Sequence, residues 1–323
     1  MNAALEVLEA GLQASVQDLG RPGFLTLGVS RSGALDRATL RLANRLVGNT
    51  DGAAALEIRS PAPVLRALST VRVALCGTSA GLIVEAAGGA VHWPSWRTVD
   101  VEAGEIIRVP PFGDSGAAYL SLSGGIDVPE VLGSRSTSVS GGFGGHEGRP
   151  LADGDRLHVF SARFGPHHTL LQPPGYPETL VLRVMRGPQD DRFTADALRL
   201  FLSQPFTVTR DISRMGARLS GEKLVHDGGA GIISDGVVPG TIQVPASGEP
   251  ILLLADCQTT GGYAKIATVI SADLPLAGRI NPGTEVRFIA IGAKKAAAAF
   301  YEAEEATGRF AAGIVPLREP ARL

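Results

Sequence analysis

Residues 251–270 read Ile-Leu-Leu-Leu-Ala-Asp-Cys-Gln-Thr-Thr-Gly-Gly-Tyr-Ala-Lys-Ile-Ala-Thr-Val-Ile. Two apolar runs, 251–254 and 266–270, flank a polar phrase that contains two adjacent glycines. Short apolar runs bounded by turn residues are typical of buried strands. The stretch therefore predicts a strand that leads through a glycine-containing turn into a second apolar segment.

The same design recurs along the chain. Its 41 glycines and 21 prolines separate many short β-branched runs, such as residues 71–75 and 179–184. Helical periodicity with good helix formers occurs in three places, at residues 36–47, 190–202 and 293–306. We therefore expect a mainly β fold of antiparallel barrels with a few peripheral helices.

The length of 323 residues exceeds the usual size of one domain and favours two. Between residues 164 and 177, phrases rich in proline and glycine interrupt the strand pattern. We expect an N-terminal β-barrel domain at residues 1–168 and a C-terminal β-barrel domain at residues 169–323.

Charge, the first residues and cysteine content indicate which partners and which cellular compartment to expect. The net charge of -2 and the pI near 6.3 provide no basic field for a phosphate backbone, so we expect no nucleic-acid partner. The first residues lack both a positive region and a long apolar stretch, so we expect no membrane association. The two cysteines, Cys76 and Cys257, form no CxxC motif and suit a reducing compartment. A cytoplasmic protein is expected.

Three motif matches lack the context that their chemistry needs. Gly77-Thr-Ser-Ala-Gly81 matches a nucleophile elbow, but residues 82–93 read as a hairpin where an elbow needs a helix. Residues 216–223 resemble a P-loop with Glu222 in the lysine position. The pair His167-His168 stands beside a proline and is interpreted as a solvated linker, and we expect no metal site.

The polar phrase after residue 254 is the candidate site. A strand that feeds a glycine-containing turn can expose backbone N–H groups, and hydroxyl, amide and ammonium groups add donors for a carboxylate or a developing oxyanion. The candidate catalytic residues are Gln258, Thr260 and Lys265. The candidate substrate-binding residues are Thr259, Gly261, Gly262 and Tyr263, with Arg214 as a more distant addition.

Lys265 and Arg214 each have a structural alternative. Lys265 is one of four lysines, and partial burial in a cleft would suit it to hold an anion or transfer a proton; a surface lysine at a strand edge is the alternative. Arg214 could bind a carboxylate or phosphate through two N–H groups, or form a structural ion pair with an aspartate. The phrases at residues 17–21 and 135–137 are interpreted as loop-stabilising hydrogen bonds.

Phrases across nearly the whole chain resemble one known family. They are Val16-Gln-Asp-Leu-Gly-Arg-Pro-Gly23, Ser32-Gly-Ala-Leu-Asp36, Ala43-Asn-Arg-Leu-Val-Gly-Asn49, Ala54-Ala-Leu-Glu57, Gly124-Gly-Ile-Asp-Val-Pro129, Leu132-Gly-Ser-Arg-Ser-Thr137, Gly141-Gly-Phe-Gly-Gly145, Ser234-Asp-Gly-Val237, Gln258-Thr-Thr-Gly-Gly-Tyr263 and Lys265-Ile-Ala-Thr-Val-Ile-Ser-Ala-Asp-Leu274. With them the chain resembles the biotin-dependent carboxyltransferase-like family, also described as allophanate hydrolase subunit 2-like or carboxyltransferase subdomain A/B. The resemblance implies two cyclophilin-like β-barrel domains.

The resemblance also implies a function shared with other chains. Family members include the C component of an ATP-dependent 5-oxoprolinase, a lactam hydrolase that opens 5-oxo-L-proline to L-glutamate together with its A and B components. The B component is the smaller partner and is similar to allophanate hydrolase subunit 1. The resemblance implies that the complex uses ATP, that this chain binds no cofactor itself, and that the turn contacts a small acidic or amide substrate.

Two other functions fit the same family. The fold is similar to the carboxyltransferase part of urea carboxylase, in which biotin is the carrier; this chain has no Ala-Met-Lys-Met attachment phrase, so biotin would come from another polypeptide. Related proteins also act without catalysis, as antagonists of a kinase-inhibitor protein. The chain departs from the family pattern at Ser213, Cys257 and Ala264, where the resemblance leads us to expect Asn, Arg and Pro.

Overall fold

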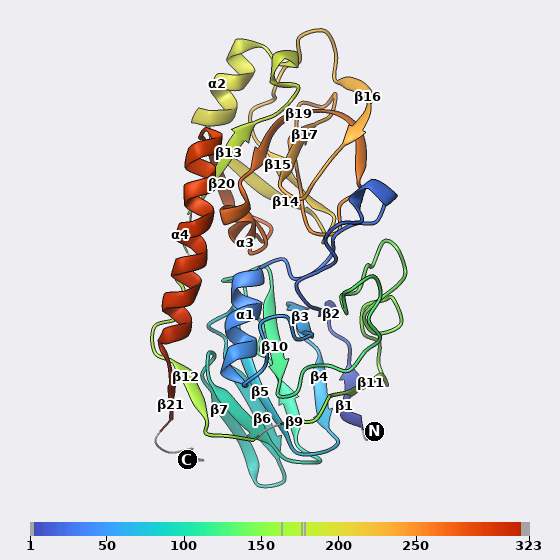
Figure 1. The fold of residues 1–323 in the computed structure, drawn as a ribbon, viewed down its shortest axis with the longest axis vertical. Coiled ribbons are helices and arrows are strands. Elements are labelled where there is room, and N and C mark those ends of the chain that lie inside the picture. Colours follow the sequence, from blue (N-terminus) through green and yellow to red (C-terminus); the bar gives the residue numbers. More distant parts are fainter. Residues whose placement is uncertain (1–2, 163, 176, 178, 318–323) are drawn as a thin grey trace. The chain divides into compact units, whose positions relative to one another are not determined.

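The computed structural model describes residues 3–162, 164–175, 177 and 179–317. These residues form mostly strands, with a few helices, which confirms the expected mainly β fold (Figure 1). The chain divides into two compact units, neither continuous in sequence. Unit 1 comprises Met1–Arg21, Ser32–Gly175 and Ala306–Leu323, and unit 2 comprises Pro22–Arg31 and Tyr176–Glu305. The expected domains 1–168 and 169–323 stay a prediction, and their outer ends, 1–2 and 318–323, lie outside the described residues.

Unit 1 contains two antiparallel sheets. The first has the order β11 (Arg156–His158), β1 (Ala3–Glu9), β4 (Val64–Ala67), β9 (Ile106–Arg108), β6 (Leu82–Ala86) and β7 (Gly89–Trp93). The second has the order β2 (Gln13–Gln17), β3 (Ala55–Arg59), β10 (Ala118–Leu122), β5 (Val71–Cys76) and β8 (Thr98–Val101). A short pair, β12 (His168–Leu170) with β21 (Ile314–Pro316), completes the unit. Both sheets bury side chains in one apolar core, so they pack as two layers.

Helix α1 (Arg37–Leu46) packs against β5 and β10 of this unit (Figure 1). It begins after Asp36, whose carboxylate accepts the Thr39 N–H at 3.0 Å and so satisfies one of the free amide groups of the first turn. It ends before Gly48, whose φ of 78° lies in the left-handed region. The helix expected at residues 36–47 is therefore confirmed to within one residue at each end.

The strands of unit 2 close on themselves. Their order is β13 (Thr179–Arg186), β20 (Glu285–Ala290), β14 (Phe206–Ile212), β15 (Gly216–Ser220), β18 (Ile251–Leu253), β17 (Thr241–Val244), β19 (Thr260–Val269) and β16 (Gly231–Gly236). An additional antiparallel pairing joins β13 to β19. Hydrogen bonds thus connect β13 through β20, β14, β15, β18, β17 and β19 back to β13, which makes a closed barrel with β16 added beside β19. The further expectation that the barrels are cyclophilin-like stays a prediction.

The remaining helices belong mainly to unit 2. They are η1 (Leu25–Leu27), η2 (Asp190–Arg192), α2 (Ala195–Ser203), η3 (Ser271–Asp273), α3 (Leu274–Ala277) and α4 (Ala293–Ala312). The segment expected to be helical at 190–202 splits into η2 and α2, because Thr194 caps α2 by accepting the Ala197 N–H at 3.1 Å. The helix expected at 293–306 extends to Ala312, and its last residues belong to unit 1.

The structure also decides two of the motif interpretations. Residues 82–93 form the predicted hairpin, with β6 paired to β7, so Gly77–Gly81 is no nucleophile elbow. The interpretation of His167-His168 as a solvated linker is wrong for His167. Its side chain is 17% exposed, its Nε2 lies 3.2 Å from an Asp100 carboxylate oxygen, and its Nδ1 lies 3.2 Å from the Thr98 hydroxyl. Side chains of unit 1 therefore hold this histidine in place.

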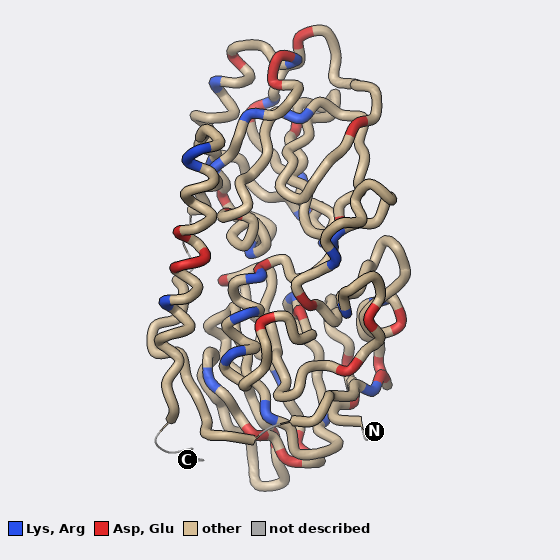
Figure 2. The backbone as a smooth tube through the Cα atoms, viewed as in Figure 1, with Lys and Arg blue, Asp and Glu red and all other residues tan. Residues whose placement is uncertain are grey.

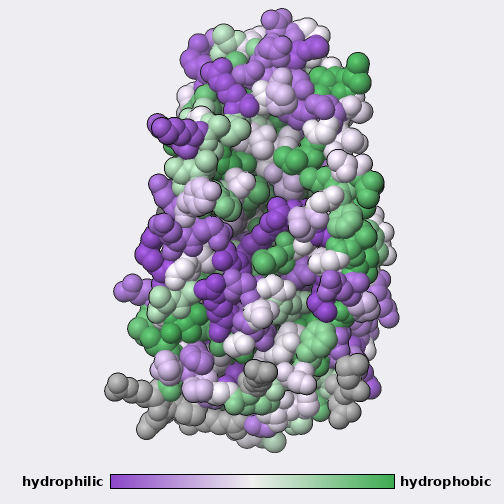
Figure 3. Space-filling view, in the orientation of Figure 1, coloured by the Kyte–Doolittle hydropathy of each residue, from purple (hydrophilic) through white to green (hydrophobic). Residues whose placement is uncertain are grey.

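Charged residues of both signs are interspersed along the backbone, as Figure 2 shows. Hydrophilic and hydrophobic residues also mix over the face drawn in Figure 3. Among the described residues, no helix combines the length and the apolar character needed to cross a membrane.

Candidate functional site

The turn between β18 and β19 is residues 254–259. The expectation of a glycine-containing turn is wrong, because Gly261 and Gly262 lie in β19, where the strand pairs with β16. Gln258, Thr260 and Tyr263 are exposed, and Thr259 is half-buried. Within the described part of the chain, the hydroxyl groups of Thr259 and Thr260 make no hydrogen bond. The Thr259 carbonyl accepts the Val237 N–H at 3.0 Å, which ties the turn to the end of β16. The turn is thus anchored through its backbone while its polar side chains face solvent.

Lys265 lies inside the barrel wall rather than at a surface edge. It is 3% exposed, and its Nζ donates to an Asp235 carboxylate oxygen at 2.5 Å and to the Gly236 carbonyl at 3.0 Å. The ammonium group holds the pKa of the Asp235 carboxyl below its usual range. Lys265 is therefore buried and not the surface lysine of the structural alternative, and its charge is balanced by a carboxylate that is itself 56% exposed.

Gln243 lies directly opposite Lys265 in the β17–β19 pair and is 2% exposed. Its Oε1 lies 3.5 Å from the Gln258 Nε2, a long contact, and its own Nε2 has no acceptor among the described residues. A Cβ placed on Gly261 would come within 2.3 Å of this Nε2. A side chain at position 261 would therefore require the amide of Gln243 to move.

Gln189, just before η2, completes the group. Its Oε1 accepts the Lys265 N–H at 3.3 Å, and its Nε2 lies 3.4 Å from an Asp235 carboxylate oxygen. We call Gln189, Asp235, Gln243, Gln258 and Lys265 the lysine cluster. It combines one ammonium, one carboxylate and three side-chain amides.

The candidate residues do not all share one face of the sheet. Side chains alternate along a strand, so Gly261, Tyr263 and Lys265 lie on one face of β19 while Thr260 and Gly262 lie on the other. Gln258 reaches the lysine cluster through Gln243. Gln258 approaches Lys265 through its long contact to Gln243, the residue opposite Lys265, and in the described part of the chain no contact joins Thr260 to either of them.

Arg214 is committed to a buried ion pair. Its Nε and Nη2 donate to the two carboxylate oxygens of Asp256 at 2.9 and 3.1 Å, and the two side chains are 3% and 1% exposed. The Asp256 N–H also donates to the Arg214 carbonyl at 2.9 Å. This arrangement matches the structural alternative for Arg214, and it fixes the start of the turn.

Cys257 points away from solvent, against Val237 and Leu253. Burial, with a smaller contribution from the Asp256 charge, raises the pKa of its thiol to about 12. The thiol is therefore protonated at neutral pH and is no nucleophile. Because the position is buried, the arginine expected there from the resemblance would have to change the local packing.

Three members of the lysine cluster escaped the sequence reasoning. Asp235 stands in the phrase Ser234-Asp-Gly-Val237, which carries the family resemblance but gives no sign of a contact with Lys265. Gln243 carried a usable signal, since it is a polar residue in the middle of the strand Thr241–Val244, all of which is buried. Gln189 lies in a loop and gave no local signal.

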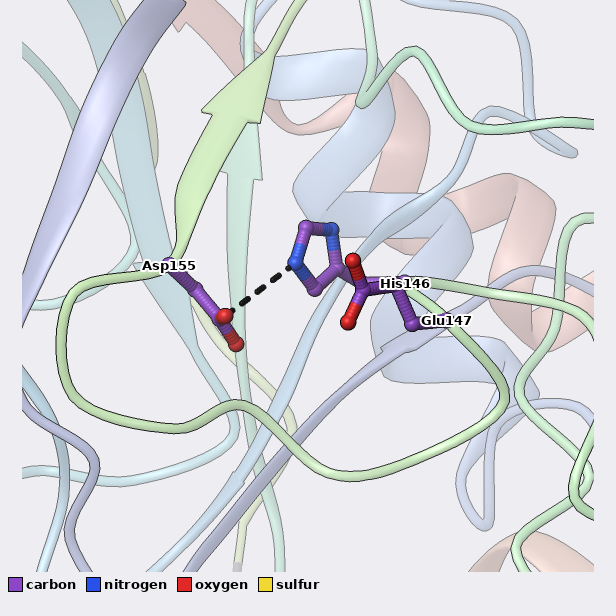
Figure 4. A group of neighbouring side chains, drawn as sticks. All are labelled: His146, Glu147 and Asp155. Carbon is purple, nitrogen blue, oxygen red and sulfur yellow. Dashed lines mark ion pairs between the residues drawn. The ribbon is translucent and has the colours of Figure 1, made fainter.

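In unit 1, His146, Glu147 and Asp155 offer metal-ligand atoms within 4.8 Å of one another (Figure 4). Arg149 already pairs with the two acidic residues, Glu147 and Asp155. It donates to both Asp155 carboxylate oxygens at 2.7 and 2.9 Å and to Glu147 at 2.6 Å. Its hydrogen bonds are the main reason that the pKa of Asp155 falls to about 2. A cation at this place would have to displace the guanidinium, so the residues do not suit a metal.

The phrases at residues 17–21 and 135–137 meet in unit 1. The Asp18 carboxylate accepts the hydroxyls of Ser134 and Ser136 at 2.6 and 2.5 Å and the Arg135 N–H at 2.6 Å. The interpretation of these phrases as loop-stabilising hydrogen bonds is confirmed.

Comparison with known proteins places this geometry in a family. Residues 27–290 match the family model described as carboxyltransferase domain, subdomain A and B. The chain is 37% identical to the C component of 5-oxoprolinase from Escherichia coli K12, over 88% of this chain and 90% of that protein. It is 31% identical to a putative urea carboxylase of Emericella nidulans, over 97% of this chain and 26% of that protein.

Comparison with solved structures indicates the same family. The crystal structure of Kluyveromyces lactis urea carboxylase matches with a TM-score of 0.85 at 29% identity, over 98% of this chain and 30% of that one. Three further solved chains at 38–40% identity are covered over 55–56% of their own length. The chain belongs to the family of the carboxyltransferase domain, subdomain A and B.

Proposed function

We propose that this chain is the C component of an ATP-dependent 5-oxoprolinase, a cytoplasmic complex that opens 5-oxo-L-proline to L-glutamate. The observation that carries the proposal is the 37% identity to the corresponding Escherichia coli protein over nearly the full length of both chains. The partners would be the A component and the smaller B component, which resembles allophanate hydrolase subunit 1. ATP would be bound elsewhere in the complex, because residues 216–223 lack the P-loop lysine and Gly216–Ser220 forms strand β15.

The lysine cluster supports a role in substrate binding. Opening a lactam places negative charge on the carbonyl oxygen, and an ammonium group with amide donors stabilises such charge when the donors are already in place. The Lys265 ammonium is buried and fixed by Asp235, and Gln243 carries an amide donor that has no acceptor among the described residues. Gln258 links this interior to the exposed turn.

The end of the turn and the first residues of β19 supply the remaining proposed contacts. Thr259, Thr260, Tyr263 and the backbone of Gly261 and Gly262 would orient the substrate, with Thr260 acting from the opposite face of β19. Arg214 would contribute through Asp256, by holding the turn in shape rather than by direct binding.

Reconstitution tests the proposal. ATP hydrolysis that depends on 5-oxoproline would be measured with this chain and both partners, and with each component omitted in turn. Activity should require all three. Unchanged activity without this chain would reject the role, and binding to a partner without turnover would favour the non-catalytic antagonist of a kinase-inhibitor protein.

The match to urea carboxylase over 98% of the chain favours a second candidate. In that case the chain would transfer a carboxyl group from biotin carried on another polypeptide. A carboxylation assay with biotin-bearing partner and urea, run beside the oxoprolinase assay, separates the two. Product formation only with urea would replace the first proposal with this one.

A further inference from the structure

Strand β16 covers the ammonium group of the lysine cluster. Lys265 is 3% exposed, and within the described part of the chain its Nζ donates only to β16, to the Asp235 carboxylate at 2.5 Å and to the Gly236 carbonyl at 3.0 Å. A substrate can therefore meet this ammonium only after the covering element has moved. Since β16 supplies both hydrogen-bond acceptors, it is the element that has to move.

The strand can leave its place without opening the barrel. It lies outside the ring of strands that runs from β13 to β19, and among the described strands it pairs with β19 alone (Figure 1). The pairing is irregular, because the register shifts between Gly231 and Asp235. Five of the six residues of β16 are exposed, and Ile233 is 94% exposed. The strand buries little apolar area, so its release costs little hydrophobic stabilisation.

Glycines lie at both ends of the strand. Gly228 and Gly229 precede it with φ of 83° and 107°, values that favour glycine. Gly231 and Gly236 are its first and last residues, and a Cβ on any of these four glycines would meet no atom within 4 Å. Close packing therefore explains none of them. They give the backbone on either side of residues 232–235 the freedom in φ and ψ that a hinge needs.

The Asp235 carboxylate holds the strand down. Its side chain is 56% exposed, whereas the Lys265 side chain is 4% exposed. A carboxylate this exposed regains water when the contact breaks, but a buried ammonium stays stable only with another negative charge beside it. The pair therefore favours the replacement of Asp235 by a second anionic group.

We propose that β16 is a flap that Asp235 holds closed over Lys265, and that it opens when an anionic group of a ligand takes the place of this carboxylate. The inference rests on the proposed function, which names Lys265 as the group that the substrate has to reach. It adds the way in which a buried ammonium becomes accessible.

A reversible cross-link tests the flap. A Cβ on Gly262 would lie 3.7 Å from the Ser234 Oγ, so Ser234→Cys with Gly262→Cys brings two sulfurs within reach of a disulfide between β16 and β19. The same protein reduced with dithiothreitol is the control. The native Cys76 and Cys257 are buried and do not compete for the cross-link.

Acetylation with N-hydroxysuccinimidyl acetate, read by peptide mass spectrometry, measures access to Lys265. The other lysines, Lys223, Lys294 and Lys295, are exposed and serve as internal controls. Because the reaction of a covered group follows the population of the open form, we expect the disulfide to slow acetylation of Lys265 by at least about tenfold. The three controls should not change. Equal rates at Lys265 in the oxidised and reduced protein would overturn the proposal.

Hydrogen exchange, followed by NMR, gives a second test that needs no cross-link. The Ala264 N–H donates to the Ala230 carbonyl, just before β16, at 3.2 Å, and it loses this acceptor when the flap opens. The Val269 N–H donates to the Gly240 carbonyl, just before β17, at 2.8 Å and should stay protected. We expect faster exchange at Ala264 than at Val269.

Two variants and two probes connect this opening to the carboxylate. Asp235→Asn should speed exchange at Ala264 by about tenfold and leave Val269 unchanged, because it weakens only the contact that closes the flap. Asp227→Asn, at an exposed aspartate of the preceding loop, is the matched control. Acetate should speed exchange at Ala264 in the unmodified chain, and acetamide at the same ionic strength should not. Equal acceleration at both amides, or equal responses to both probes, would overturn the proposal.

Turnover separates this inference from the proposed function. In the reconstituted complex the oxidised double-cysteine chain should lose oxoprolinase activity and regain it with dithiothreitol. Equal activity in both forms would reject the flap. If neither form nor the unmodified chain supports turnover, the proposed function fails, and acetylation and hydrogen exchange of the chain alone still decide whether β16 opens.

Discussion

The ammonium of Lys265 lies 2.5 Å from the carboxylate of Asp235, although the lysine side chain is 4% exposed and the aspartate side chain 56% exposed. The pair joins the interior of the barrel wall to its surface. A buried ammonium is stabilised only if it keeps its partners, and here these are one carboxylate and one backbone carbonyl. The proposed role of the lysine is therefore that of an ammonium held in one place, with its charge balanced by the more exposed carboxylate.

Lys265→Met tests this role in turnover. Removal of a preorganised charge that stabilises a transition state typically lowers kcat by about 10²-fold or more. We expect a loss of that order in the reconstituted complex. Lys294→Met, at an exposed lysine on α4, is the control and should retain full activity. Equal activity of the Lys265 and Lys294 variants would remove the lysine from the proposed site.

Substitutions at Gly261 and Gln243 should have strongly coupled effects on the free energy of unfolding. Gly261→Ala introduces a Cβ within 2.3 Å of the Gln243 Nε2, and overpacking of this kind costs about 1–3 kcal/mol. Gln243→Ala removes the obstacle, so the double variant should lose less stability than the sum of the two single variants. Urea unfolding of the four proteins measures this difference.

Gly262→Ala is the matched control for that experiment. Its Cβ would lie 3.6 Å from the nearest atom, the Ile232 carbonyl oxygen, an ordinary van der Waals contact. We expect little change in the free energy of unfolding. Additive effects of Gly261→Ala and Gln243→Ala would contradict the proposed steric reason for this glycine.

Breaking the Arg214–Asp256 pair should lower the free energy of unfolding strongly, whereas replacing both residues should lower it much less. Arg214→Met leaves a carboxylate buried without its cation, which typically costs about 3–5 kcal/mol. Replacement of both residues, Arg214→Met with Asp256→Leu, should recover most of that loss because no unpaired charge stays behind. Arg218→Met, at a half-exposed pair with exposed Asp211, should cost about 1 kcal/mol or less. Thermal or urea unfolding checks all three.

The local part of the fold followed from the sequence. The pattern at residues 251–270 predicted a strand, a glycine-containing turn and a second apolar segment; the structure has β18 and β19 there, and β19 already begins at Thr260, so that it includes both glycines. Helix α1 was predicted from the helical periodicity of residues 36–47; the structure adds that Asp36 is its cap and that Gly48 follows its end.

The lysine cluster depends instead on which strands become neighbours. Strand β19 has β17 on one side and β16 with β13 on the other, and this pairing brings Gln243 and Asp235 to Lys265 from 22 and 30 residues away. A single sequence contains no local signal for such register, because a shift by one residue reverses every side chain. The site could therefore be predicted at the turn but not in its interior.

Acid stability should depend measurably on Asp155. Arg149 lowers the pKa of this carboxyl to about 2 in the folded chain, against an ordinary value of 3.8. A depressed folded pKa contributes stability that is complete above the unfolded pKa and is lost as the pH falls through the folded pKa. The free energy of unfolding should thus decline between about pH 4 and pH 2, and Asp155→Asn should flatten that decline while lowering stability at pH 7. Asp153→Asn, at an exposed aspartate that pairs with no cation in the described part of the chain, is the control. Urea unfolding across this pH range makes the comparison, and an equally steep decline in the Asp155 variant would show that other carboxylates carry the acid dependence.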